Sequence, residues 1–214
     1  MHLSQHTLIW FGCLIVAVIL HEISHGLVAL WFGDRTAREA GRLTLNPVPH
    51  IDPVGSIVLP ALMILSTGTA VGWAKPVPVN PGRLRRPRRD MILVSLAGPA
   101  TNLLLMAGAA IGARYLFLHT TSTARSFEDL PLGIQVLFTF AEVNVLLAVF
   151  NLLPLPPLDG SALVERLLPA AWLPRWYQIR PYGILVIFVL VLFTSVFTTL
   201  LTPVDDRLFN FVFR

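Results

Sequence analysis

The residues best suited to chemistry are His21, Glu22 and His25, which form the pattern H-E-x-x-H. If this stretch is helical, residues four apart share one face, so both imidazole rings point toward the same ion. Glu22 then lies beside that ion without having to bind it. Two neutral nitrogen ligands and an adjacent carboxylate base are what a zinc hydrolase needs to activate water. The pattern is only moderately specific, because a pair of helix histidines with polar neighbours also arises by chance.

The setting of the motif favours a functional role. It lies in an apolar run from Leu8 to Phe32, which is long enough to cross a bilayer, and burying two histidines and a glutamate there is costly. The chain has 214 residues, of which 55% are hydrophobic and 13% are charged, and its mean hydropathy is +0.70. Soluble domains are far more charged. We therefore predict an all-α polytopic membrane protein with a single integral domain over residues 1–214.

The apolar runs predict about four to five transmembrane helices. Spans are expected over residues 8–32, 91–113, 132–153 and 181–202, while residues 53–74 either cross or form a re-entrant segment. Short extended strands are expected in loops, because residues 42–45 alternate in polarity and residues 75–81 are punctuated by prolines. We expect the core to cover about residues 8–165, with a C-terminal scaffold helix over about 181–202. The N-terminus lacks Lys and Arg, so we expect no cleavable signal peptide.

A catalytic zinc ion requires a third protein ligand and one open position. Cys13, the single cysteine, excludes a cysteine-based zinc site and an intramolecular disulfide. The best-placed acids are Glu142 and Asp159. Asp159 follows a proline-broken segment at the end of a span, where interrupted backbone can line a cavity, and Gly160 permits a tight turn there. The residues alone leave both acids open as ligands.

Taken together, the motifs resemble those of the site-2 protease family of intramembrane zinc metalloproteases, family M50. The resemblance covers about residues 15–165 and points to the compact prokaryotic branch, without a PDZ or CBS domain. It is carried by the following stretches: His21-Glu22-x-x-His25; Asn46-Pro-x-x-His50-Ile-Asp52-Pro53-x-Gly55; Gly72-Trp73-Ala74-Lys75-Pro76-Val77-Pro78-Val79; Ala97-Gly98-Pro99 with Asn102; and Asn151-x-x-Pro154-x-Pro156-Pro157-Leu158-Asp159-Gly160.

The resemblance implies a complete catalytic set. His21, His25 and Asp159 would bind one Zn²⁺ per chain, Glu22 would be the catalytic base, and no other cofactor is implied. Asn102 and Asn151 would contact the substrate or the oxyanion. The activity implied is cleavage of transmembrane protein substrates by metal-activated water, that is, regulated intramembrane proteolysis.

Other polar residues in the apolar runs have alternative explanations. Asn144 is at least as well explained by hydrogen bonds between helices. Glu142 is better explained as a wetted or paired acid than as a ligand, and His50 and Asp52 are expected near the entrance of the site rather than as ligands. The segment 72–79 is either a strand that pairs with unwound substrate or a surface loop.

The basic residues test the topology. If residues 53–74 cross the membrane, the Lys and Arg residues divide nine to seven between the two sides, which is almost no bias. If those residues re-enter, the division is twelve to four, and His25 and Asp159 approach the same face. We therefore expect the re-entrant arrangement in the cell membrane, with the active site toward the cytoplasmic side. Arginines in short loops beside spans report orientation, so we expect the lipid bilayer and no nucleic acid as partner.

Two rival functions remain at this point. A non-proteolytic zinc-binding membrane protein, such as a transporter or a chaperone-like protein, would have no need of Glu22 beside the metal. A metal-free transporter would be expected to show internal repeats, and we find none in the sequence. The identity of the substrate and the oligomeric state do not follow from the sequence.

Overall fold

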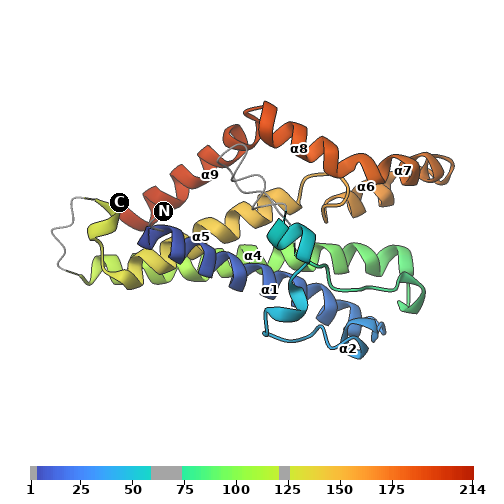
Figure 1. Ribbon diagram of the computed structural model, residues 1–214, viewed down its shortest axis with the longest axis horizontal. Helices are drawn as coiled ribbons and strands as arrows, with labels where there is room; N and C mark the ends of the chain where they lie inside the picture. The colour runs from blue at the N-terminus through green and yellow to red at the C-terminus, as the bar shows by residue number, and fades with distance from the viewer. Residues whose placement is uncertain (1–3, 59–73, 121–125) are drawn as a thin grey trace.

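The computed structural model describes residues 4–58, 74–120 and 126–214, and these residues form helices and loops without a β-strand (Figure 1). The long helices are α1 (Gln5–Trp31), α4 (Pro87–Leu118), α5 (Leu132–Asn151), α8 (Gly183–Phe193) and α9 (Val196–Phe213). The short ones are α2 (Thr36–Glu39), α6 (Ser161–Leu167) and α7 (Leu173–Ile179). Single turns are η1 (Val48–His50), η2 (Pro53–Val58), η3 (Pro81–Arg83), η4 (Phe127–Asp129), η5 (Ala170–Trp172) and η6 (Arg180–Tyr182).

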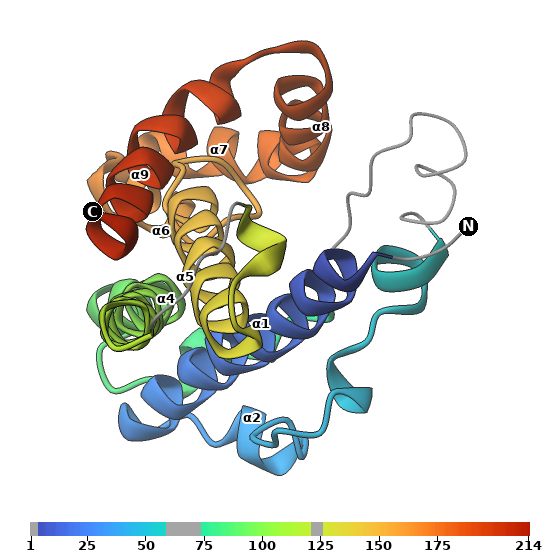
Figure 2. The same ribbon diagram turned by 90° about the vertical axis from the view of Figure 1, so that its left-hand side faces the viewer.

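Three helices, α1, α4 and α5, are long and apolar enough to cross a membrane, with 27, 32 and 20 residues. They pack against one another along their length, and α9 packs against α4 and α5 (Figure 2). Small residues make this packing close, because Ala110 and Ala113 of α4 meet Ala141 of α5 in one buried cluster. The all-α polytopic prediction is confirmed, and the first three predicted spans correspond to these helices.

The last predicted span differs from the structure. Residues 181–202 do not form one helix, because α8 ends at Phe193 and α9 begins at Val196. Thr194 is extended, with φ −135° and ψ 158°, and its hydroxyl donates to the Leu190 carbonyl oxygen at 2.6 Å. Side-chain bonds of this kind compete with the helical ladder, and apolar periodicity does not reveal them. Helix α9 then returns to the end of the bundle where α1 begins (Figure 1).

The predicted loop strands are also absent from the described residues. Residues 43–45 form bends, and residues 42 and 74–80 are non-helical but belong to no ladder. The alternating prolines explain why residues 74–80 form no strand, because Pro76 and Pro78 have no N–H to donate to a ladder. Most of the predicted re-entrant segment, residues 59–73, lies outside the described residues. Its described beginning is the π-helical turn η2, whose first N–H groups are capped by Asp52.

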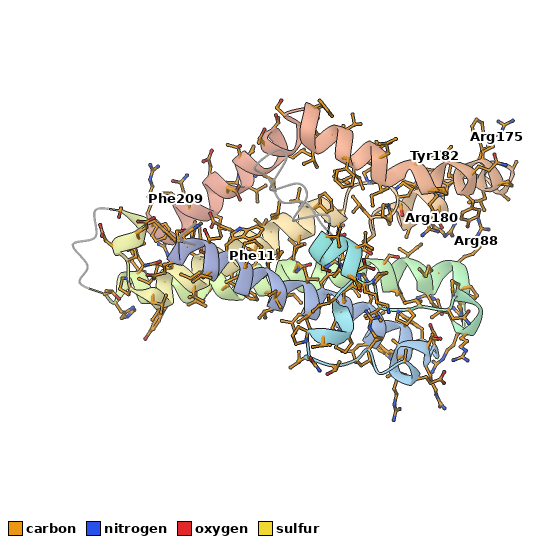
Figure 3. The ribbon with its side chains drawn as sticks, viewed as in Figure 1. Phe11, Arg88, Arg175, Arg180, Tyr182 and Phe209 are labelled. Atoms are coloured by element: carbon orange, nitrogen blue, oxygen red, sulfur yellow. The ribbon has the colours of Figure 1, made fainter. Side chains whose placement is uncertain are left out.

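The connection between α1 and α4 begins and ends at the same end of the bundle. The Arg85 N–H donates to the Phe32 carbonyl oxygen at 3.1 Å, which joins the end of α1 to the approach to α4. The two ends of this connection therefore lie at the same end of the bundle, as the re-entrant arrangement requires. The same end of the bundle carries Arg88, Arg175 and Arg180 (Figure 3), whereas Phe11 and Phe209 lie toward the other end.

Candidate metal centre

Three side chains from distant parts of the chain converge beside α1. His21 and His25 occupy successive turns of that helix and are both buried, with their Nε2 atoms 3.1 Å apart. The Asp159 Oδ2 atom lies 3.1 Å from the His21 Nε2 atom and 3.3 Å from the His25 Nε2 atom. Within the described part of the chain, this trio is the group of His, Cys, Asp and Glu side chains arranged to hold a metal ion.

Hydrogen bonds on the far side of each ring fix its tautomer. The His21 Nδ1 atom lies 2.5 Å from the Asn102 Oδ1 atom, and the His25 Nδ1 atom lies 2.6 Å from the Val94 carbonyl oxygen. Both partners are oxygen acceptors, so each Nδ1 must carry the proton and donate it. Each neutral ring then turns the lone pair of its Nε2 atom toward Asp159, which is the form of histidine that binds metals.

A zinc ion fits these atoms. Two imidazole lone pairs and a carboxylate oxygen meet with no proton between them, and the Asp159 Oδ2 atom is buried without a well-formed hydrogen bond. Three acceptors at one point require a cation. Ligands about 2.0–2.1 Å from a tetrahedral zinc ion lie about 3.3–3.4 Å from one another, close to the observed separations of 3.1, 3.1 and 3.3 Å.

The amide of Asn102 is the middle of a buried chain of hydrogen bonds from α5 to His21. Asn144 of α5 donates from Nδ2 to the Phe140 carbonyl oxygen, which fixes the orientation of its amide. Its Oδ1 atom then accepts from the Asn102 Nδ2 atom at 2.8 Å, so Asn102 must present its oxygen to His21. Asn144 thus links two helices, as one of the sequence-based explanations expected, and it also determines the tautomer of His21.

Helix α4 approaches the histidines closely because residue 98 is glycine. A Cβ atom on Gly98 would lie 2.5 Å from the His25 Nε2 atom and 2.6 Å from the His21 Nε2 atom, well inside van der Waals contact. The predicted small-residue stretch Ala97-Gly98-Pro99 therefore lies where the two helices must come together. One face of α4 forms a wall of the metal centre.

Asp159 is positioned by the turn that follows α5. The Gly160 N–H donates to the Asn151 carbonyl oxygen at 2.7 Å, which folds the proline-rich segment back onto the end of the helix. A Cβ atom on Gly160 would collide with the carbonyl oxygens of Leu152 and Leu153. Glycine is therefore required for the turn that brings Asp159 to the histidines.

Glu22 is half-buried and lies next to the ligands on α1. Its Oε2 atom accepts a hydrogen bond of 2.7 Å from the Val77 N–H. Asn151, the second predicted substrate contact, donates from Nδ2 to the Leu147 carbonyl oxygen of its own helix at 3.0 Å. Its predicted role at the site stays a prediction.

The other polar residues considered from the sequence do not join the metal group. Glu142 faces Asp205 of α9 and interacts with its charge. His50 is buried and directs its Nε2 atom to the Thr44 carbonyl oxygen at 3.0 Å. Sequence reasoning missed two backbone groups, the Val94 carbonyl oxygen and the Val77 N–H, because neither carries a side-chain signal.

Comparisons with known proteins identify a family and relatives of this chain. The model of peptidase family M50 matches residues 130–194, a stretch that includes Asp159. "Putative zinc metalloprotease YwhC" of Bacillus subtilis (strain 168) is 42% identical over 178 residues, which cover 83% of this chain and 77% of YwhC. "Putative zinc metalloprotease Rip2" of Mycobacterium tuberculosis (strain H37Rv) is 37% identical over 153 residues, which cover 71% of this chain and 54% of Rip2. No solved structure matches the chain.

Proposed function

The chain belongs to peptidase family M50, the site-2 protease family, and we propose that it is an intramembrane zinc metalloprotease that cleaves membrane-spanning proteins. The observation that carries the proposal is the meeting of three buried acceptors, from His21, His25 and Asp159, with the carboxylate of Glu22 beside them. A purely structural zinc site is closed by four protein ligands, whereas a catalytic one has three and an adjacent base.

In this proposal, His21, His25 and Asp159 hold the zinc ion and Glu22 is the general base. When bound, zinc would supply the Lewis acidity that polarises a scissile carbonyl and makes water a better nucleophile near neutral pH. Glu22 takes a proton from the attacking water and delivers it to the leaving nitrogen of the cleaved peptide. General-base assistance of this kind is typically worth about 10²–10⁴ in rate.

Asn102 acts in this scheme through His21 rather than on the substrate. Its oxygen accepts from His21 and its nitrogen donates to Asn144, so both ends of the amide are engaged. A partner of this kind fixes the ring and raises its basicity as a ligand. We keep Asn151 as the candidate for contact with the oxyanion or the substrate backbone.

The position of the centre in the bundle supports a substrate that spans the membrane. The ligands come from α1 and from the turn after α5, and both helices are candidate spans. The end of the bundle nearest the site also carries the basic loops (Figure 3), and the positive-inside rule places such loops in the cytoplasm. We propose an active site that opens toward the cytoplasmic side of the cell membrane.

Metal analysis tests the ligand set. The purified protein should contain about one zinc ion per chain, and Asp159→Ala should lose most of it, because a three-ligand site rarely survives with two ligands. Full occupancy in Asp159→Ala would show that another residue is the third ligand. A protein that holds zinc but cleaves no substrate would support the non-proteolytic alternative.

A further inference from the structure

Beside the face of helix α1 that carries His21 and His25 lies a second face, which carries Glu22. A non-helical segment, residues 74–80, lies on this second face. Residues 74–80 pass the helix at Gly26, one turn after Glu22 and therefore on the same face. A Cβ atom on Gly26 would lie 2.5 Å from the Leu43 Cδ2 atom and 3.1 Å from the Val77 Cγ1 atom. Glycine at position 26 thus allows Val77 to approach closely enough for its N–H to reach Glu22 at 2.7 Å.

The segment is held at both ends by groups that the proposed mechanism does not use. At its start, the Lys75 N–H donates to the His50 carbonyl oxygen at 2.9 Å, and the Lys75 carbonyl oxygen accepts from the Arg42 Nη2 atom at 2.6 Å. At its end, the Asn80 N–H donates to the Asp34 Oδ2 atom at 2.6 Å. Pro76 and Pro78 have no N–H, so Val77 carries the donor at the centre of the segment.

The surroundings of Asp34 suit a residue that holds the end of the segment in place. Its side chain is fully buried, and its Oδ1 atom accepts from both the N–H and the hydroxyl of Thr36, at 2.9 and 2.5 Å. Burial alone would raise the pKa of Asp34, but the hydrogen bonds from Thr36 and Asn80 outweigh it and hold that pKa below its usual range. The carboxylate is therefore charged at neutral pH and fully occupied by donors from two parts of the chain.

We propose that residues 74–80 orient the general base: the Val77 N–H holds the Glu22 carboxylate in place, and Asp34 and Arg42 are positioning residues that hold the segment. This inference rests on the proposed function, because it assigns a role only if Glu22 is the base. The carboxylate of a glutamate is carried on three successive single bonds and has considerable rotational freedom, and the hydrogen bond from Val77 removes much of it. Misplacement of a reacting group by about 1 Å costs about 10²-fold in rate.

The direct test is Val77→Pro, which removes one N–H in a segment that already alternates with proline. We expect kcat for a membrane-spanning substrate to fall by about 10- to 100-fold, while KM and zinc content stay at wild-type values. The matched control is Leu45→Pro, in a non-helical stretch outside this segment, where the side chain is exposed and the N–H makes no bond to another described residue. That variant should keep the kcat and the zinc content of the wild type.

If Val77→Pro does not fold, a second pair of variants tests whether residues 74–80 orient Glu22. Asp34→Ala removes both acceptors and should lower kcat with little loss of zinc, whereas Asp34→Asn keeps one oxygen acceptor and should lower kcat less. Combining Val77→Pro with Glu22→Gln should give little further loss beyond Glu22→Gln alone, because the group being oriented is already gone.

Failure of the inference is distinguishable from failure of the proposed function. If Glu22→Gln abolishes cleavage while Val77→Pro and Asp34→Ala keep wild-type kcat, the segment does not position the base and the inference is overturned. Equal zinc loss in Val77→Pro and Asp34→Ala would also overturn it, since the segment would then support the metal rather than the base. Cleavage that survives Glu22→Gln would instead overturn the proposed function itself.

Discussion

Replacing Gly98 by alanine is expected to weaken zinc binding although it adds only one methyl group. The new Cβ atom would lie 2.5 Å from the His25 Nε2 atom and 2.6 Å from the His21 Nε2 atom, whereas ordinary contacts begin at 3.4 Å. The rings and α4 must therefore separate by about 0.8–0.9 Å to restore van der Waals contact. Both rings are also tied to α4, through Val94 and Asn102, so they cannot retreat without breaking those bonds.

The expected loss follows from how tightly zinc sites are defined. Zinc–ligand distances vary by only about 0.2 Å, so a displacement several times larger cannot be absorbed by the metal. We expect Gly98→Ala to lower zinc affinity by about 10- to 100-fold, as is typical when the groups that orient metal ligands are disturbed. Cleavage measured at limiting zinc should fall in parallel.

The assay is a competition titration of purified protein with a zinc chelator, and Gly108→Ala is the matched control. Gly108 lies on the same helix, and a Cβ atom there would meet nothing within 4 Å. Alanine favours a helix over glycine by about 1 kcal/mol, so helix propensity cannot explain a loss in Gly98→Ala. Wild-type affinity in Gly98→Ala would refute the close approach of α4 to the two ligands.

Two further predictions concern the hydrogen bond between His21 and Asn102 and the topology. Asn102→Ala should lower zinc affinity by about 10- to 100-fold, because His21 loses the acceptor for its Nδ1 proton; equal affinity in a chelator titration would show that this bond does not matter. Single cysteines at positions 85 and 175, placed in a Cys13→Ser background, should both be labelled from the cytoplasmic side of intact cells. Labelling from opposite sides would contradict the shared basic end of the bundle.

The sequence predicted those parts of the molecule that follow from local patterns. H-E-x-x-H on an apolar run placed two imidazoles and a carboxylate on adjacent faces of α1, and the proline-broken stretch before Gly160 indicated where a third ligand could enter. The structure brings Asp159, rather than Glu142, to the two histidines. Apolar length also identified three of the long helices correctly.

What the sequence did not reveal depends on contacts between distant residues or on backbone groups. The break at Thr194 coincides with a hydroxyl that bonds to the Leu190 carbonyl oxygen, and a hydropathy profile does not distinguish this threonine from one within a helix. The family resemblance pointed to Asn102 as a contact for the substrate or the oxyanion, without indicating its partners in the fold. Its orientation toward His21 follows only from the chain of bonds that begins at Phe140.

The central claim, that Glu22 is the general base of a zinc protease, is tested most directly by Glu22→Gln. The amide has nearly the shape of the carboxylate but cannot accept the proton of water at neutral pH. With zinc content and membrane insertion equal to wild type, cleavage of a single-span substrate with helix-weakening residues should fall by about 10²–10⁴-fold, toward the upper end if Glu22 serves both proton transfers. Near-normal cleavage by Glu22→Gln at equal zinc would contradict the mechanism.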